Sequence, residues 1–137
     1  MVGIFPEGGL RAGATSVLEG AKPKAGIAML SVLSQAPIQP CVLIGTDRLY
    51  RGKNWRPGKR IPIWVAFGEP IIPDATLEKA EAIAKIESAL GEAFILLKDR
   101  LVREYGLTPN DLPQTPQHRK GEENLTAKNA ENAKRQK

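Results

Sequence analysis

One long apolar repeat constrains the fold of this chain more than any other feature. Between residues 74 and 106, apolar side chains recur at spacings of three and four, which predicts an amphipathic helix. Asp74 or Thr76 suits its N-cap, and Gly106 suits its C-terminal stop. We expect the apolar stripe to cover one face of a β-sheet, although a partner or a membrane surface is the alternative. The stripe consists of Leu77, Ala80, Ile83, Ile86, Leu90, Phe94, Leu97 and Leu101.

Three apolar runs predict the strands of that sheet. They cover residues 2–5 (VGIF), 38–45 (IQPCVLIG) and 60–71 (RIPIWVAFGEPI). The first is expected to be buried on both faces, and the second to be a central parallel strand. A short helix is predicted over residues 24–33. Strands alternating with helices favour the α/β class, with a partial, mainly parallel sheet and flanking helices. Because three apolar strands alone would leave exposed edges, part of the sheet is expected to be missing.

Length and composition indicate one domain. The chain has 137 residues, of which 42% are hydrophobic, and residues 109–137 contain almost no apolar side chain larger than alanine. We therefore expect a domain over residues 1–108 and a disordered, basic polar tail over residues 109–137. Neither a signal peptide nor a membrane-spanning stretch is expected. The single cysteine, Cys41, excludes an internal disulfide and a multi-cysteine metal site, and we expect it to be a buried, inert thiol.

The positive charge is concentrated in two places. The net charge is +5, and residues 47–60 alone hold six basic residues against one acidic residue. Residues 114–137 add six basic and three acidic residues. Such segments attract phosphates of nucleic acids, anionic membranes or small substrates, or they are simply solvated. An aromatic content of 5% argues against stacking on single-stranded nucleic acid.

The segment GIFPEGGLRAG, residues 3–13, predicts a ligand site. It places Glu7 at the carboxyl end of an expected strand, where ligands bind in open α/β sheets. Gly8 and Gly9 allow a ligand to approach the backbone, and Arg11 can offer two parallel N–H groups to a phosphate. Glu7 could orient Arg11 or accept a hydrogen bond from a substrate hydroxyl. A β-turn with a surface ion pair is the alternative, and neither a P-loop nor a dinucleotide fingerprint is present.

The segment IFPEGGLR resembles the third sequence block, FPEG-T-R-S, of the glycerolipid acyltransferases, such as the 1-acylglycerol-3-phosphate acyltransferases. The family's lysine–x–glycine segment is matched by Lys24 and Gly26. Its fourth block is matched by APIQPCVLIG, with Pro37 and Pro40 as structural residues. A later FGEPI segment is similar to the family's G-x-P-I. The similarity covers about residues 2–105, but Gly9 replaces the family's threonine, and the arginine comes one residue late because Leu10 intervenes.

The resemblance implies transfer of a fatty acyl group to the hydroxyl of a lysophospholipid or glycerol phosphate. Acyl-CoA or an acyl-carrier protein would be the co-substrate, and no cofactor or metal is implied. The acceptor's phosphate side would be bound by Glu7, Gly8, Gly9 and Arg11, and Lys24 and Gly26 would shape the same pocket. The resemblance also implies a peripheral protein on the cytoplasmic side of a membrane. The basic residues 48–60 could then rest on anionic headgroups.

The family's catalytic block, His-x-x-x-x-Asp, has no counterpart before FPEG. The only histidine, His118, has Glu123 at the same spacing, but this pair follows the other blocks and is not expected to be catalytic. We therefore expect the C-terminal half of an acyltransferase domain, inactive alone. It would be a fragment, a split gene product or a pseudo-enzyme completed by a separately encoded N-terminal half. The alternative is a non-enzymatic anion- or nucleic-acid-binding module that uses residues 48–60 and the tail. Under the acyltransferase hypothesis, nucleic acid is not an expected partner.

Overall fold

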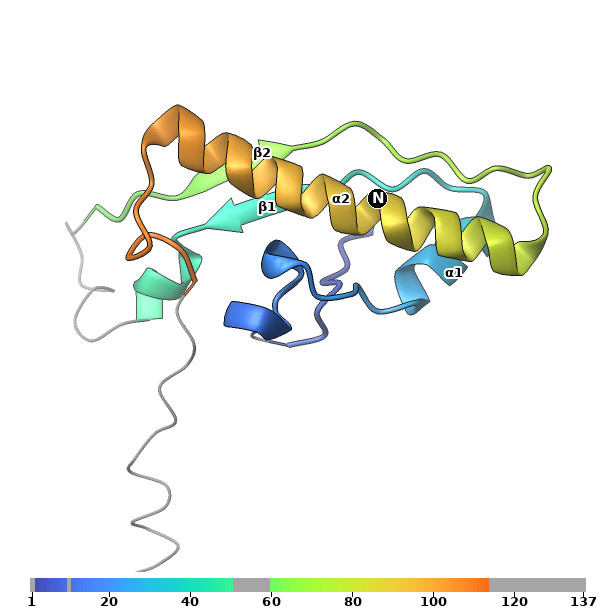
Figure 1. Ribbon diagram of the computed structural model, residues 1–137, viewed down its shortest axis with the longest axis horizontal. Coiled ribbons are helices and arrows are strands. Elements are labelled where there is room, and N and C mark those ends of the chain that lie inside the picture. Colours follow the sequence, from blue (N-terminus) through green and yellow to red (C-terminus); the bar gives the residue numbers. More distant parts are fainter. Residues whose placement is uncertain (1, 10, 51–59, 114–137) are drawn as a thin grey trace, which may run out of the picture.

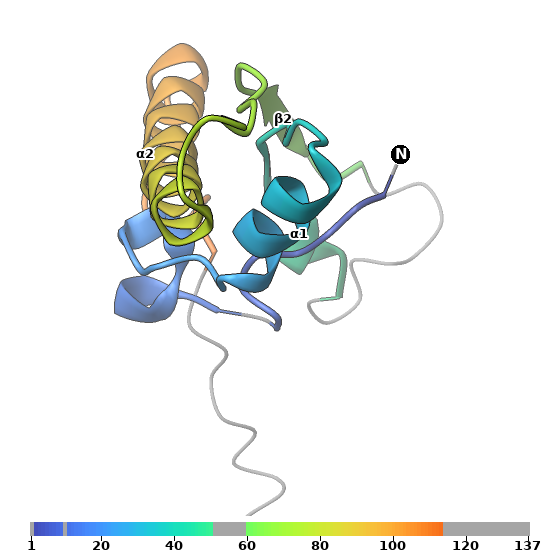
Figure 2. The ribbon, with the colours of Figure 1, turned by 90° about the vertical axis from the view of Figure 1, so that its right-hand side faces the viewer.

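The computed structural model describes residues 2–9, 11–50 and 60–113. A long helix, α2, lies across two short strands and beside a shorter helix, α1 (Figure 1). The quarter-turned view shows α2 nearly end-on, on one side of α1 and the strands (Figure 2). In chain order the elements are η1 (Gly13–Thr15), η2 (Val17–Glu19), α1 (Gly26–Ser34), β1 (Cys41–Ile44), η3 (Thr46–Tyr50), β2 (Trp64–Phe67) and α2 (Lys79–Tyr105), where η denotes a 3-10 helix.

The two strands form an antiparallel pair. The register runs from Cys41 opposite Phe67 to Ile44 opposite Trp64. An isolated bridge between Ile38 and Ile71 continues the pairing. Both strands are shorter than predicted, because Pro40 directly precedes β1, Pro62 and Pro70 lie on either side of β2, and none of these prolines has an N–H for the ladder. A single pair of strands is too small to test a mainly parallel α/β sheet, which remains a prediction.

Gly45 ends β1 at a place where other residues do not fit. Its φ is +99°, a backbone conformation that residues with a side chain rarely adopt. A Cβ at this position would lie 2.5 Å from the carbonyl oxygen of Pro62. The close approach of the chain before β2 therefore depends on glycine here.

Residues 2–5 are not part of a strand in the described chain. Val2 and Phe5 are 80% and 84% exposed, so the prediction of a strand buried on both faces is wrong for this segment. The apolar composition is the one expected for a strand, but a strand also needs a neighbouring strand, and no described strand pairs with these residues.

The core lies between α2 and one face of the sheet. The buried side chains of α2 pack with Val42, Ile44 and Ala66, as the apolar repeat predicts. Ala80 of the predicted stripe is exposed, and Leu77 precedes the helix. Burying a Leu, Ile or Phe side chain contributes about 1.5–3 kcal/mol, so this contact dominates the stability of the fold. The buried apolar residues of α2 are Ala82, Ile86, Leu90, Phe94, Leu97 and Leu101.

The sequence predicts the C-terminal end of α2 correctly but not its N-terminal start. Gly106 ends the helix with a φ of +60°, and its N–H donates to the carbonyl of Val102, which confirms the predicted stop. Neither Asp74 nor Thr76 is the N-cap, because the carboxylate of Asp74 accepts the N–H and hydroxyl of Thr76 in a local turn. These hydrogen bonds lower the pKa of Asp74. The helix begins at Lys79, after Glu78.

The predicted helix over residues 24–33 is α1, shifted by one or two residues. None of the described helices combines the length and the apolar character that crossing a bilayer requires.

The chain remains packed after α2. Leu107 is buried, and Leu112 packs against the core. Asp111 pairs with Arg48 of η3. The described part of the expected tail, residues 109–113, therefore lies against the domain.

Candidate functional site

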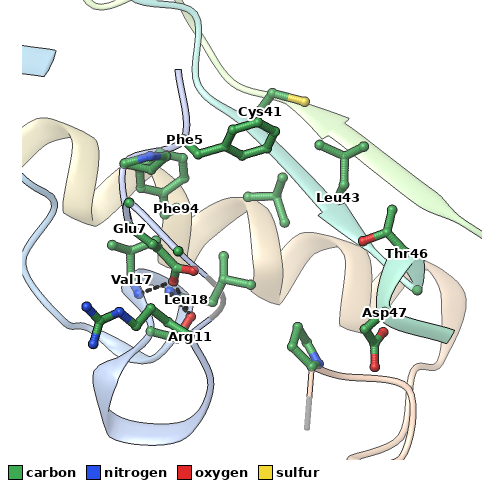
Figure 3. Close-up of a pocket in the computed structure, with 17 residues that line it drawn as sticks. Phe5, Glu7, Arg11, Val17, Leu18, Cys41, Leu43, Thr46, Asp47 and Phe94 are labelled. Atoms are coloured by element: carbon green, nitrogen blue, oxygen red, sulfur yellow. Dashed lines mark hydrogen bonds between the residues drawn. The ribbon is translucent and has the colours of Figure 1, made fainter. Parts of the chain in front are cut away.

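A pocket of about 690 Å³ lies between the PEGG loop, η2, β1 and α2 (Figure 3). Polar groups line part of it, among them Glu7, Arg11 and Thr46. The rest of the wall is mainly apolar, which suits a ligand that has both a polar and an apolar part. The apolar side chains come from Phe5, Val17, Leu18, Val42, Leu43 and Phe94.

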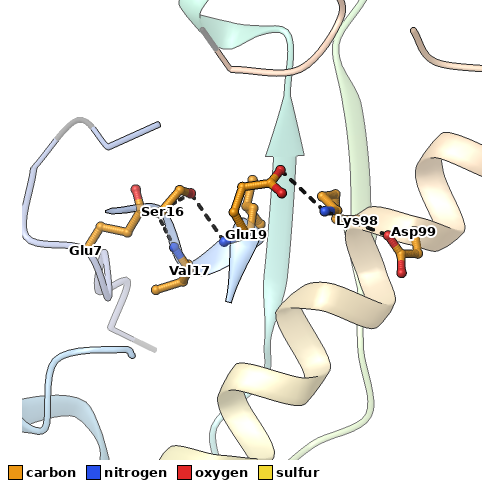
Figure 4. A network of polar contacts seen from close by, with 7 residues as sticks. Glu7, Ser16, Val17, Glu19, Lys98 and Asp99 are labelled. Carbon is orange, nitrogen blue, oxygen red and sulfur yellow. Dashed lines mark hydrogen bonds and ion pairs between the residues drawn. The ribbon is translucent and has the colours of Figure 1, made fainter. Parts of the chain in front are cut away.

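Glu7 holds the loop in place. One oxygen of its carboxylate accepts hydrogen bonds from the Ser16 hydroxyl, at 2.6 Å, and from the Val17 N–H, at 2.8 Å (Figure 4). The hydroxyl oxygen of Ser16 in turn accepts the N–H of Leu18 and caps η2. Among the described residues, Glu7 accepts no hydrogen bond from Arg11. The carboxylate therefore fixes the loop against η2, and of its two expected roles only acceptance from a substrate stays open.

The helix η2 is tied to α2 on its other side. The ammonium group of Lys98 lies 3.3 Å from the carboxylate of Glu19 and 3.8 Å from that of Asp99 (Figure 4). The Lys98 side chain is mostly buried, which strengthens its ion pairs relative to those in open solvent. The loop, η2 and α2 thus form one connected support for the pocket.

Arg11 lies at the rim of the pocket. Its side chain is exposed, and its guanidinium group points away from the apolar wall (Figure 3). In the part of the chain that the structure describes, Arg11 has no ion-pair partner. An uncompensated guanidinium beside a glycine loop can form two parallel hydrogen bonds to an anion.

Lys24 contacts the PEGG loop, but it is not one of the residues that line the pocket. Its backbone N–H donates to the carbonyl of Pro6 at 3.0 Å. Its side chain lies over Gly8, where a Cβ would come within 2.7 Å of the ammonium nitrogen. Gly8 has a φ of +65° and accepts this neighbour because it lacks a side chain. Gly9 lines the pocket, whereas Gly26 lies at the start of α1 and outside the pocket wall.

The two prolines of the fourth block have structural positions. Pro40 is fully buried next to Gly68, and Pro37 is exposed between α1 and β1. Cys41 is half-buried rather than buried and lines the pocket. Burial raises the pKa of the Cys41 thiol, which keeps it protonated at neutral pH and agrees with an inert role.

The basic segment is described only at its ends. Arg48 donates to the Asp111 carboxylate and, at 3.1 Å, to the carbonyl of Asn110. Its guanidinium carbon lies 5.6 Å from the centre of the Trp64 ring. The hydrogen bond from Arg48, followed by those from Thr108, lowers the pKa of Asp111 to about 2. Arg48 is therefore engaged within the protein, and residues 51–59 lie outside the described residues.

Sequence reasoning missed three contributors to this site. Ser16 and the N–H of Val17 hold Glu7, and Phe94 of α2 closes the apolar wall. Ser16 precedes the apolar residues Val17 and Leu18, which is a signal for a helix N-cap. The segment 14–22 has no clear apolar periodicity, however, so the sequence does not predict a helix there. Leu10, His118 and Glu123 lie outside the described residues.

Neither a search for metal-ligating groups nor a comparison with known proteins adds to the description of this site. No group of three or more metal-ligating side chains occurs within residues 2–9, 11–50 and 60–113. Comparison with protein-family models, curated proteins and solved structures finds no match. The family resemblance therefore rests on the sequence blocks alone.

Proposed function

We propose that this chain is the acceptor-binding, C-terminal half of a glycerolipid acyltransferase-type domain. It binds a lysophospholipid or glycerol-phosphate acceptor, and the acyl donor is acyl-CoA or an acyl-carrier protein. One observation carries the proposal: the FPEGG loop, with Arg11, and a mainly apolar wall line the same pocket. An amphiphilic phosphate is the ligand class that matches both parts of that lining.

Each residue of the loop has a role in the proposed complex. Arg11 provides two parallel hydrogen bonds to the phosphate, and the ammonium group of Lys24, which lies over Gly8, adds positive charge. Gly9 lets the phosphate approach the backbone. Glu7 keeps the loop in register with η2 through its hydrogen bonds to Ser16 and Val17.

Under this proposal, these 137 residues do not catalyse acyl transfer by themselves. Attack of the acceptor hydroxyl on the thioester carbonyl of the donor forms the ester and breaks the C–S bond, and it requires a base that takes the hydroxyl proton and passes it to the departing thiolate. The His-x-x-x-x-Asp block that supplies this base in the family is not in the 137 residues. We propose that residues outside these 137 supply the base, and that the complete site lies at the cytoplasmic face of a membrane.

Calorimetric titration tests the binding proposal. We expect wild-type protein to bind a lysophosphatidate at least about tenfold more tightly than the monoacylglycerol that lacks the phosphate. Arg11→Gln should remove most of this preference, because it removes the guanidinium that binds the phosphate and leaves only the Lys24 charge. Arg60→Gln is the matched control, since Arg60 is exposed and not part of the pocket lining. Equal affinity of the wild type for the two lipids, or an equal loss in both variants, would contradict the proposal.

An acyl-transfer assay tests the half-site character separately. With radiolabelled acyl-CoA and a lysophosphatidate, we expect no transfer above the uncatalysed rate by this chain alone. Turnover near the usual enzyme range of about 1–10³ s⁻¹ would show that the chain carries its own base.

A further inference from the structure

The segment that follows α2 returns to the pocket. We call residues 107–113 the strap; it contains neither a helix nor a strand. Leu107 is buried, Leu112 packs on the core, and Pro113 lines the pocket. The strap thus brings a distant part of the chain into the wall of the candidate site.

Arg48 fastens the strap to η3. Its guanidinium donates to the carboxylate of Asp111 and to the carbonyl of Asn110 while it lies over the ring of Trp64. The second oxygen of Asp111 accepts the N–H of Thr108, at 2.8 Å, and its hydroxyl, at 2.7 Å. One carboxylate therefore both shapes the turn of the strap and joins it to η3. The side chains of Arg48 and Asp111 are only 21% and 25% exposed, so solvent competes little for this ion pair.

The element that carries Arg48 also contributes to the pocket. Thr46 and Asp47 of η3 line the wall next to the end of β1. The Arg48–Asp111 pair therefore connects two pieces of wall that lie more than 60 residues apart in the sequence. Neither piece belongs to the sheet or to α2, and the Arg48–Asp111 pair joins them directly.

We propose that Arg48 is a positioning residue of the pocket, which holds Pro113 in the wall and thereby determines how firmly the apolar part of a ligand is bound. This inference rests on the proposed function, because the ligand is an amphiphilic phosphate. An apolar chain gains affinity from contact on every side, and a wall that moves away forfeits that contact. The phosphate end is bound at Arg11, which is not part of the Arg48–Asp111 pair.

Titrations with dodecyl phosphate and with inorganic phosphate separate the two ends of the site. Arg48→Ala and Asp111→Asn should each weaken binding of dodecyl phosphate about fivefold, because an apolar contact is lost. Binding of inorganic phosphate should not change. Arg48→Lys, which keeps a positive charge beside Asp111, should retain more of the affinity for dodecyl phosphate than Arg48→Ala. Pro113→Ala should reproduce the loss without touching the ion pair, and Arg60→Ala should have no effect.

The outcomes distinguish this inference from the proposed function. If wild-type protein binds no dodecyl phosphate, both are wrong. If it binds while Arg48→Ala, Asp111→Asn and Pro113→Ala leave the affinity unchanged, the proposed function survives and the role of Arg48 is wrong. A parallel loss of inorganic phosphate binding would also overturn that role, because the effect would then not be confined to the apolar wall. If Arg48→Ala does not fold, the Asp111→Asn and Pro113→Ala variants decide.

Discussion

Both faces of the β1–β2 sheet are apolar, but the described part of the chain packs a helix on only one of them. Val42, Ile44 and Ala66 are buried beneath α2. Leu43 and Val65, which alternate with them along the same strands, are 46% and 45% exposed. Successive side chains of a strand point to opposite faces, so four-residue strands supply both surfaces.

The difference teaches where the stability of the chain resides. Strands that are apolar on both faces are typical of sheets buried on both sides, and the described chain covers this sheet on one side. The covered face should therefore carry most of the folding free energy, and the outer face should tolerate change. The predictions below test this contrast, beginning with the largest effect.

Leu90→Ala should lower the free energy of unfolding by about 3–5 kcal/mol. Leu90 of α2 is fully buried in the core beneath the helix, and its truncation leaves a cavity. Leu96→Ala on the exposed side of the same helix should change the free energy of unfolding by less than about 0.5 kcal/mol. Urea denaturation followed by circular dichroism measures both. Equal effects of the two substitutions would show that α2 does not cover the sheet as described.

Gly45→Ala should cost about 2 kcal/mol or more, because alanine is strained at a φ of +99° and its Cβ would meet the Pro62 carbonyl. Gly91→Ala is the matched control, since no atom lies within 4 Å of a Cβ there. In the middle of α2 it should instead stabilise the protein by about 0.5–1 kcal/mol. A harmless Gly45→Ala would mean that the end of β1 is not closely packed.

Glu7→Gln should cost about 1 kcal/mol, because a neutral amide replaces the charged acceptor shared by Ser16 and Val17. The effect should be local to the pocket, so hydrogen exchange of the Val17 and Leu18 amides should accelerate more than that of amides in α2. Uniform acceleration throughout the chain would indicate that the loop is part of the global core.

Phe67→Thr should change the free energy of unfolding by less than about 0.5 kcal/mol, because Phe67 is 63% exposed on the outer face and threonine also favours strands. Binding of an apolar fluorescent dye should decrease as the exposed apolar surface becomes smaller. A loss comparable to that of Leu90→Ala would show that the outer face is covered after all.

Acid should weaken the contact between the strap and η3 through Asp111. Its pKa is lowered from 3.8 to about 2, so the stabilisation is fully present above about pH 4 and is lost as the pH falls towards 2. In Asp111→Asn the stability should depend less steeply on pH over this interval. An unchanged slope would mean that this carboxylate is not engaged in the folded state.

The sequence predicts the elements whose signals are local. The apolar stripe of α2 and its end at Gly106 follow from residues in or next to the helix. The start of the helix is not predicted correctly, because the carboxylate of Asp74 accepts a hydrogen bond from Thr76 in a local turn and does not cap α2. Burial of residues 2–5 depends on neighbours that a single segment cannot specify.

The candidate site is predicted in part for the same reason. Glu7, Gly8, Gly9 and Arg11 are adjacent in the sequence and line one pocket. Their partners Ser16 and Phe94, and the wall residue Pro113, reach the pocket only through the tertiary fold. Spacing alone could not identify them.

Mapping the ligand on the protein tests the central claim most directly. In a titration of ¹⁵N-labelled protein with a lysophosphatidate, the amide shifts of Gly8, Gly9, Val17 and Thr46 should change with one common dissociation constant, because these residues line the pocket. Arg11→Gln should raise that dissociation constant about tenfold. Shift changes confined to residues 51–59 and 114–137, with the pocket amides unaffected, would contradict the account and favour a non-enzymatic anion-binding module.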